Sequence, residues 1–330
     1  MDTHADGAPL MAPALNIVFM IYDSRSGSTL LARKLTEEVK GVAVTPEIGF
    51  DSLLRLHQDV LSRDGALHVV RELFKSGDYR NIGVEQAALE AALMDLPEPL
   101  TTLALIQLSL GMWHKATGQT ATNIIVKNGT HAKYWRDILR IWQEAGRVIY
   151  VYRDPRAVIN SKLRTPRPYH DYEVMAWGGA MLAAWRWKRY SNLMRDAEEA
   201  GLKTLNVQYE QFLANPALEL ARVSSFLAIN AEPSLSAVNY SIPLAELKIH
   251  KLVSGGAIKA ERGEAWRREL SSFDCNAIES VCQAEMSRRG YVPLRTLGKP
   301  ASFLVLLAAL SGSMLKIARH FLLLVLTHAK

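Results

Sequence analysis

Five short apolar runs, separated by longer stretches of helical periodicity, dominate the hydrophobic pattern of the chain. The runs cover residues 16–21, 42–45, 123–127, 147–152 and 204–207. The first run is apolar at successive positions, so an extended segment there would be buried on both of its faces. Burial on both faces is typical of strands inside a parallel sheet. The pattern therefore predicts five strands of one parallel sheet.

Between the runs, apolar residues recur at the three- and four-residue spacing of helices. This spacing predicts helices over residues 29–39, 134–144 and 173–200, a mostly helical region over 51–117, and further helices as far as Gly290. Strands that alternate with helices form a parallel sheet covered on both faces. The predicted fold class is α/β, a parallel sheet flanked by helices, which binds ligands at the carboxyl ends of its strands.

The beginning of the chain lacks periodicity. Residues 1–13 are expected to form a flexible tail ahead of one domain over residues 14–293. Asp2 and Asp6 replace the basic start of a signal peptide, and the apolar run at 14–22 is too short to span a bilayer. The expected location is cytoplasmic, including the inner face of a membrane.

A hydrophobic helical segment is predicted at residues 294–330. Its two apolar runs, at 301–310 and 321–326, flank a basic stretch around Lys316. A helix of this pattern either makes peripheral membrane contact, here through residues 301–328, or packs on the core of its own domain. The sequence pattern leaves both hypotheses open.

Composition and charge narrow the classes of ligand. Hydrophobic residues make up 49% of the chain, which suits a globular domain with a substantial core. A net charge of +6 and a pI near 9.2 favour anionic ligands or a membrane surface. No dense Lys/Arg stripe with interleaved aromatic residues points to nucleic acid. Cys275 and Cys282 have neither disulfide nor metal-ligand spacing, and no metal is expected.

A polar loop follows the first predicted strand and leads into a helix. It reads, with the start of that helix, Arg25, Ser26, Gly27, Ser28, Thr29 and Leu30. A strand–loop–helix unit points backbone N–H groups and the positive end of the helix at one spot, which favours an anion. Gly27 permits close approach of the backbone. The Lys of a Walker A motif is absent, so the loop differs from an ATP or GTP site.

A second candidate phosphate site follows the fourth predicted strand. Arg153 stands at the end of this strand, Pro155 opens a helix, and Ser161 comes eight residues after Arg153. An arginine can hold a phosphate through two parallel hydrogen bonds, and a serine hydroxyl adds another donor.

Together these two motifs resemble those of sulfotransferases that use 3′-phosphoadenosine 5′-phosphosulfate. Residues 25–31 resemble the 5′-phosphosulfate loop of that family, and Arg153 with Ser161 resembles its 3′-phosphate motif. The resemblance covers residues 16–291 and implies a P-loop NTPase-like sulfotransferase fold. It also implies nucleotide contacts from Tyr209 and, in a late basic loop, from Lys259. The sequence is more similar to the carbohydrate and tyrosyl-protein types than to the cytosolic small-molecule type.

Sulfuryl transfer needs a cation beside the leaving phosphate and a base beside the acceptor hydroxyl. The resemblance assigns the cations to Arg25 and to Lys127, at the end of the third strand. Glu47, after the second strand, is the predicted base, and His131 is the alternative. The expected acceptor is a hydroxyl of a carbohydrate or glycolipid.

Two other functions remain as alternatives. A P-loop nucleotide kinase would bind Mg-ATP without preference for a 3′-phosphate. A non-catalytic, membrane-associated nucleotide-binding protein would need no base at Glu47. The sequence predicts neither the identity of the acceptor nor the oligomeric state.

Overall fold

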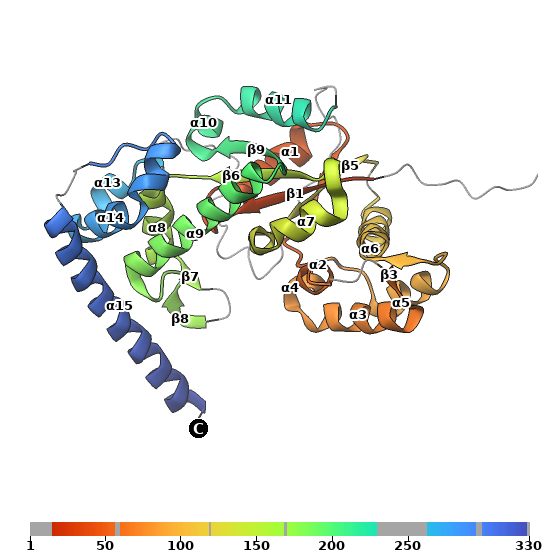
Figure 1. Ribbon diagram of the computed structural model, residues 1–330, viewed down its shortest axis with the longest axis horizontal. Coiled ribbons are helices and arrows are strands. Elements are labelled where there is room, and N and C mark those ends of the chain that lie inside the picture. The colour runs from red at the N-terminus through yellow and green to blue at the C-terminus, as the bar shows by residue number, and fades with distance from the viewer. Residues whose placement is uncertain are drawn as a thin grey trace, which may run out of the picture.

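A five-stranded parallel sheet forms the centre of the molecule (Figure 1). The computed structural model describes residues 15–56, 60–118, 120–167, 170–229, 263–294 and 299–328. The strand order is β2-β5-β1-β6-β9. The strands are β1 (Asn16–Tyr22), β2 (Val42–Val44), β5 (Asn123–Lys127), β6 (Arg147–Tyr152) and β9 (Lys203–Gln208). β1 thus lies at the centre, with β5 on one side and β6 on the other.

Successive side chains of β1 enter different hydrophobic cores. Phe19 and Ile21 join the core on one face of the sheet, where α7 (Trp135–Trp142) and α9 (Gly179–Glu199) pack. Val18 and Met20 join the core on the other face. That face is covered by α1 (Ser28–Glu38), α10 (Tyr209–Ala214) and α11 (Pro216–Phe226). Alternating side chains thereby fix the sheet between two helical layers.

The region between β2 and β5 is mostly helical, as predicted. It contains α2 (Asp51–Leu54), α3 (Arg63–Lys75), α4 (Gly77–Arg80), α5 (Gln86–Met94) and α6 (Thr102–Ala116). Two short strands of this region, β3 (Val60–Leu61) and β4 (Leu100–Thr101), form an antiparallel pair. The 3₁₀ turns η1 (Gly129–Tyr134) and η2 (Gln143–Ala145) flank α7.

The predicted fold class is confirmed, and the five strands lie within a few residues of their predicted bounds. The prediction of a helix starting at residue 173 is wrong. After α8 (Pro155–Arg164), the strands β7 (Pro166–Arg167) and β8 (His170–Val174) pair, and α9 begins only at Gly179. Gly179 has φ +87°, a backbone conformation that a continuing helix cannot include.

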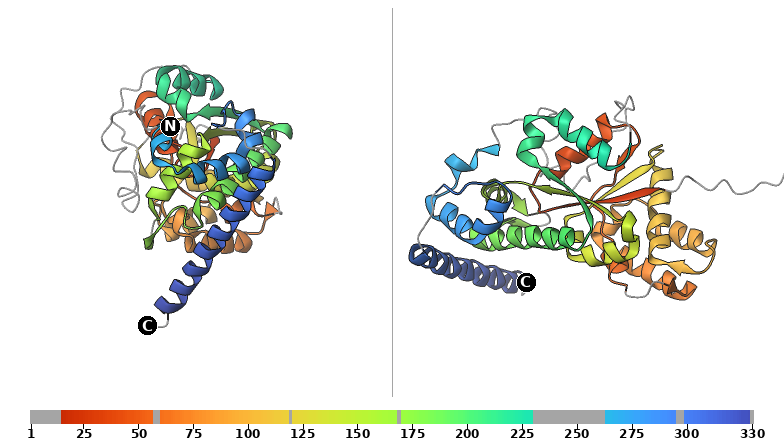
Figure 2. Two further views of the ribbon diagram at one scale, coloured as in Figure 1. Left: turned by 90° about the vertical axis from the view of Figure 1, so that its left-hand side faces the viewer. Right: turned by 45° about the horizontal axis from the view of Figure 1, so that its top comes forward.

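The C-terminal segment forms the long helix α15 (Lys299–His328). It packs on α9 and on α14 (Ser272–Arg288), where Val305, Leu306 and Ala309 join a third core. Figure 2 shows its C-terminal half running out beyond the body of the molecule. Among the described residues, no helix is long and apolar enough to cross a membrane. The contacts of Val305, Leu306 and Ala309 agree with the packing hypothesis for one side of α15.

Candidate active site

The predicted site residues lie at the carboxyl edge of the sheet. The loop of Arg25 follows β1, and Glu47 follows β2. Lys127 ends β5, while Arg153 and Tyr209 follow β6 and β9. Because all five strands are parallel, these residues reach the same edge. The contacts described below show which of them meet.

The loop after β1 has a backbone that depends on glycine. Gly27 has φ +92°, and a Cβ atom there would lie 2.1 Å from Cδ2 of Tyr209. A side chain at position 27 would therefore collide with the Tyr209 ring, which packs over the loop. Ser28, Thr29 and Leu30 form the first turn of α1, whose initial N–H groups face the same loop.

Both phosphate motifs come together at this loop. Arg25 Nε donates a hydrogen bond to Ser161 Oγ at 3.0 Å, and Arg153 Nη1 donates to the Arg25 carbonyl at 3.3 Å. The Arg153 guanidinium lies 4.4 Å from the centre of the Tyr209 ring. Residues 128 and 136 positions apart in sequence therefore share one cationic site.

Ser26 gives this site an unused polar group. Its side chain is only 1% exposed, and its Oγ has no hydrogen-bond partner among the described residues. Buried hydroxyls are nearly always hydrogen-bonded in folded proteins. The orphaned Ser26 hydroxyl, beside two arginines and a helix N-terminus, therefore fits an anionic ligand.

Glu47 and Lys127 form an ion pair. Lys127 Nζ lies 3.5 Å from Glu47 Oε2, with the lysine side chain 1% exposed and that of the glutamate 34% exposed. The backbone around Glu47 is held in place, since Asn81 donates to the Glu47 carbonyl and Asn128 donates to the Ile48 carbonyl, each at 2.9 Å. The backbone that carries the carboxylate is therefore fixed, while the carboxylate itself is accessible from solvent.

His131, the alternative base, lies in the core. Its Nε2 accepts a hydrogen bond from the Phe50 N–H at 3.1 Å, and its ring packs against Phe19 and Phe50. Burial lowers the pKa of His131 to about 3. A fully buried imidazole with one nitrogen engaged is poorly placed to meet an acceptor, so the geometry argues against this alternative.

The burial of His131 predicts a loss of stability in acid. The folded chain leaves His131 neutral down to about pH 3, whereas the unfolded chain protonates it near pH 6.5. Below pH 6.5 the unfolded state thus binds more protons, and stability falls as the pH falls. Between pH 7 and pH 5, the free energy of unfolding measured with urea should fall by about 2 kcal/mol more for the wild type than for His131→Gln. The glutamine keeps a hydrogen-bond acceptor at this position but does not titrate. Equal losses would contradict this prediction.

A buried ion pair beneath the loop was not predicted. Lys162, directly after Ser161, donates to Asp23, and both side chains are almost fully buried. Burial lowers the pKa of Lys162, and the Asp23 carboxylate opposes this shift. The pair ties the start of the loop to α8, so it holds Arg25 and Ser161 together. No local sequence motif marks a pair that spans 139 residues.

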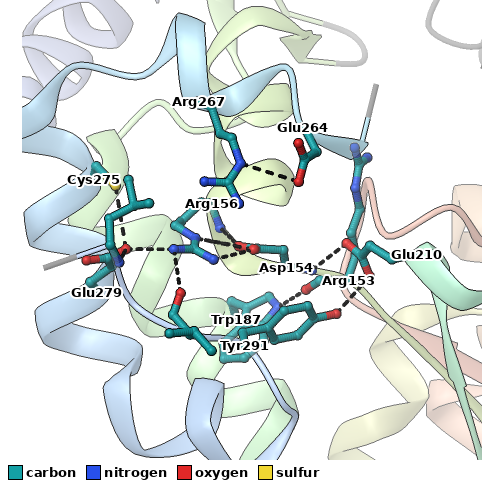
Figure 3. Close-up of polar contacts among 12 residues, drawn as sticks. Arg153, Asp154, Arg156, Trp187, Glu210, Glu264, Arg267, Cys275, Glu279 and Tyr291 are labelled. Carbon is teal, nitrogen blue, oxygen red and sulfur yellow. Dashed lines mark hydrogen bonds and ion pairs between the residues drawn. The ribbon is translucent and has the colours of Figure 1, made fainter. Parts of the chain in front are cut away.

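A second unpredicted set of contacts fixes the segment of Arg153 (Figure 3). Trp187 Nε1 donates to the Arg153 carbonyl at 3.0 Å. Glu210 accepts from the Asp154 N–H at 3.1 Å and from the Tyr291 hydroxyl at 2.9 Å. Burial raises the pKa of the Glu210 carboxyl. The peptide group between Arg153 and Asp154 is thus held from α9 and α10.

Arg156 continues this set of contacts toward α14. Its guanidinium pairs with Asp154 and with Glu279, each at 2.7 Å (Figure 3). It also lies 4.0 Å from the centre of the Trp266 ring. Trp266 belongs to the short helix α13 (Trp266–Glu269). The predicted nucleotide contact Lys259 lies outside the described residues.

Comparison with known proteins agrees with this geometry. Residues 18–233 match the sequence family described as "Sulfotransferase family". A solved sulfotransferase domain from the curacin biosynthetic pathway superposes with TM-score 0.54 at 18% identity, over 85% of this chain and 99% of that one. One from the Synechococcus PCC 7002 olefin synthase gives 0.52 at 16% identity, over 83% and 96%. No curated protein sequence matches significantly.

The structural likeness, at such low identity, concerns the fold alone. The family match covers more than half of the chain and includes the loop after β1, the strand ends and the segment from Arg153 to Ser161. It confirms the family expected from the two phosphate motifs. The chain belongs to the sulfotransferase family and is a sulfotransferase enzyme.

Proposed function

We propose that the enzyme takes its sulfuryl group from 3′-phosphoadenosine 5′-phosphosulfate and transfers it to a hydroxyl of a carbohydrate or lipid-linked acceptor. The observation that carries the donor assignment is the contact between the two phosphate motifs. Arg25 bonds Ser161, and Arg153 bonds the Arg25 carbonyl. Two separate cationic groups at one site suit a nucleotide with phosphates on both its 5′ and its 3′ side.

The loop residues would hold the 5′ end of the donor. Ser26 Oγ, the Arg25 guanidinium and the first N–H groups of α1 supply hydrogen bonds and positive charge there. Arg153 and Ser161 would hold the 3′-phosphate. When bound, the donor supplies an activated sulfuryl group on a good leaving group.

Glu47 would remove the proton of the acceptor hydroxyl. Its carboxylate is reachable from solvent, as a base that meets an incoming acceptor must be. Lys127 lies almost fully buried beside it and places a positive charge where negative charge grows during transfer. The two residues therefore have complementary roles.

The function is tested by incubating the enzyme with donor radiolabelled in its sulfate, together with separate glycan and glycolipid acceptors. We expect labelled sulfate esters among the products. Label found only on amines or on protein tyrosines would contradict the proposed acceptor, while transfer itself would stand. If the enzyme bound Mg-ATP as tightly as the labelled donor, the proposed donor would be contradicted.

Arg153→Gln should weaken the preference for a 3′-phosphate. We expect the affinity for adenosine 3′,5′-diphosphate to fall about 10- to 100-fold, because a charged hydrogen bond to phosphate is lost, while affinity for adenosine 5′-phosphate changes little. Titration calorimetry with both nucleotides measures the difference. Arg147→Gln, at the opposite end of β6, is the matched control. An unchanged preference in Arg153→Gln would assign the 3′-phosphate to other residues.

A further inference from the structure

The outer side of α15 presents an apolar surface that no described residue covers. Six large apolar side chains on it are between 49% and 73% exposed: Phe303, Leu304, Leu307, Leu310, Met314 and Leu315. Their spacing places them on one side of the helix, opposite the side of Val305 and Ala309 that packs on the domain. Contiguous apolar surfaces of this kind mark interaction sites.

The same segment carries most of the net charge of the protein. Residues 295–330 hold five basic residues, Arg295, Lys299, Lys316, Arg319 and Lys330, and no Asp or Glu. Five positive charges against none negative give this segment +5 of the total of +6, and the other 294 residues only +1. The apolar surface thus belongs to the segment in which positive charge is concentrated along the chain.

We propose that α15 docks the enzyme on an anionic lipid surface. The apolar side chains would enter the boundary between headgroups and acyl chains, and the basic residues would attract the anionic headgroups. A second copy of the chain fits this surface less well, because it would bring two segments of +5 charge together. This proposal does not depend on the identity of the donor or acceptor.

The arrangement of α15 sets its orientation on the lipid. One side of the helix is bound to α9 and α14, so the helix must lie along the surface, between the domain and the membrane. Thirty residues of helix extend about 45 Å, long enough for several turns of contact. Figure 1 shows α15 on the side of the molecule toward which the strands of the sheet run. Docking would therefore bring the catalytic edge near lipid-linked acceptors.

Vesicle co-sedimentation of the full chain tests the proposal. Vesicles of phosphatidylcholine with about one third phosphatidylserine should bind the enzyme at least about 10-fold more tightly than pure phosphatidylcholine, and high salt should remove the difference. The triple variant Leu304→Gln, Leu307→Gln, Leu315→Gln should bind the mixed vesicles about 100-fold more weakly, because three inserted side chains become polar.

Exposed positions allow a matched control. Met94→Gln changes a residue of α5 that is 51% exposed, and it should leave vesicle binding unchanged. Circular dichroism should show the same unfolding temperature for both variants and the wild type, because the replaced residues lie on the surface. Equal vesicle binding by the triple variant and the wild type would overturn the proposal. A wild-type dimer in solution that the triple variant loses would assign the surface to self-association instead.

Discussion

Glu47→Gln is expected to lower the rate of sulfuryl transfer by about 10²- to 10⁴-fold, the usual contribution of a positioned general base. The amide is nearly isosteric with the carboxylate but cannot accept the proton of the acceptor hydroxyl. Asn81 and Asn128 hold the carbonyls of Glu47 and Ile48 independently of the side chain, so the fold should be preserved. Donor affinity should therefore change little, and the loss should appear in kcat.

The control for this variant is Glu37→Gln. Glu37 lies on the surface of α1, is 26% exposed, and pairs with Arg33 much as Glu47 pairs with Lys127. Removing that carboxylate should leave kcat unchanged. Rates are compared under saturating donor, with donor affinity measured separately. If Glu47→Gln kept full kcat while His131→Gln lost it, the base would be His131 despite its burial.

The strands and the donor loop could be predicted because their signals are local. A strand buried on both faces reads as an unbroken apolar run, as in β1, and parallel strands bring their carboxyl ends to one edge. Lys127 ends such a run, Arg153 directly follows one, and Arg25 and Glu47 come a few residues after theirs. The topology alone therefore brings them close, even though the runs are far apart in sequence.

The supporting contacts could not be predicted because they depend on distant partners. Nothing next to Lys162 indicates that it pairs with Asp23, and nothing next to Gly27 indicates that Tyr209 packs on it. These contacts arise only in the folded domain, where α8 reaches the start of the loop after β1 and β9 joins the sheet beyond β6. The start of α9 was predicted wrongly for a different reason. Residues 173–178 continue the apolar pattern of the helix, but they form the end of β8 and a turn that ends at Gly178.

The same distinction applies to α15. Its sequence favours membrane contact and core packing about equally, because an apolar helix offers several faces. The structure divides these faces, with Val305 and Ala309 toward α9 and α14 and Leu304 and Leu315 outward. Both hypotheses then concern different sides of one helix, and the outward side is the one that vesicle binding tests.

Arg25→Ala should lower kcat/KM about 10³-fold, a loss similar to that caused by removing one donor to a developing negative charge. Arg25 also bonds Ser161, so donor affinity should fall as well. Arg25 has φ +73°, a strained conformation that alanine would share, which keeps the backbone cost similar in the variant.

Arg33→Ala on α1, whose side chain is 28% exposed, serves as the matched control and should keep full activity. Added guanidinium ion should restore part of the lost rate in Arg25→Ala if the charge itself acts in transfer. Full activity of Arg25→Ala would contradict the proposed catalytic site, whereas a loss without any rescue would limit Arg25 to holding the loop together.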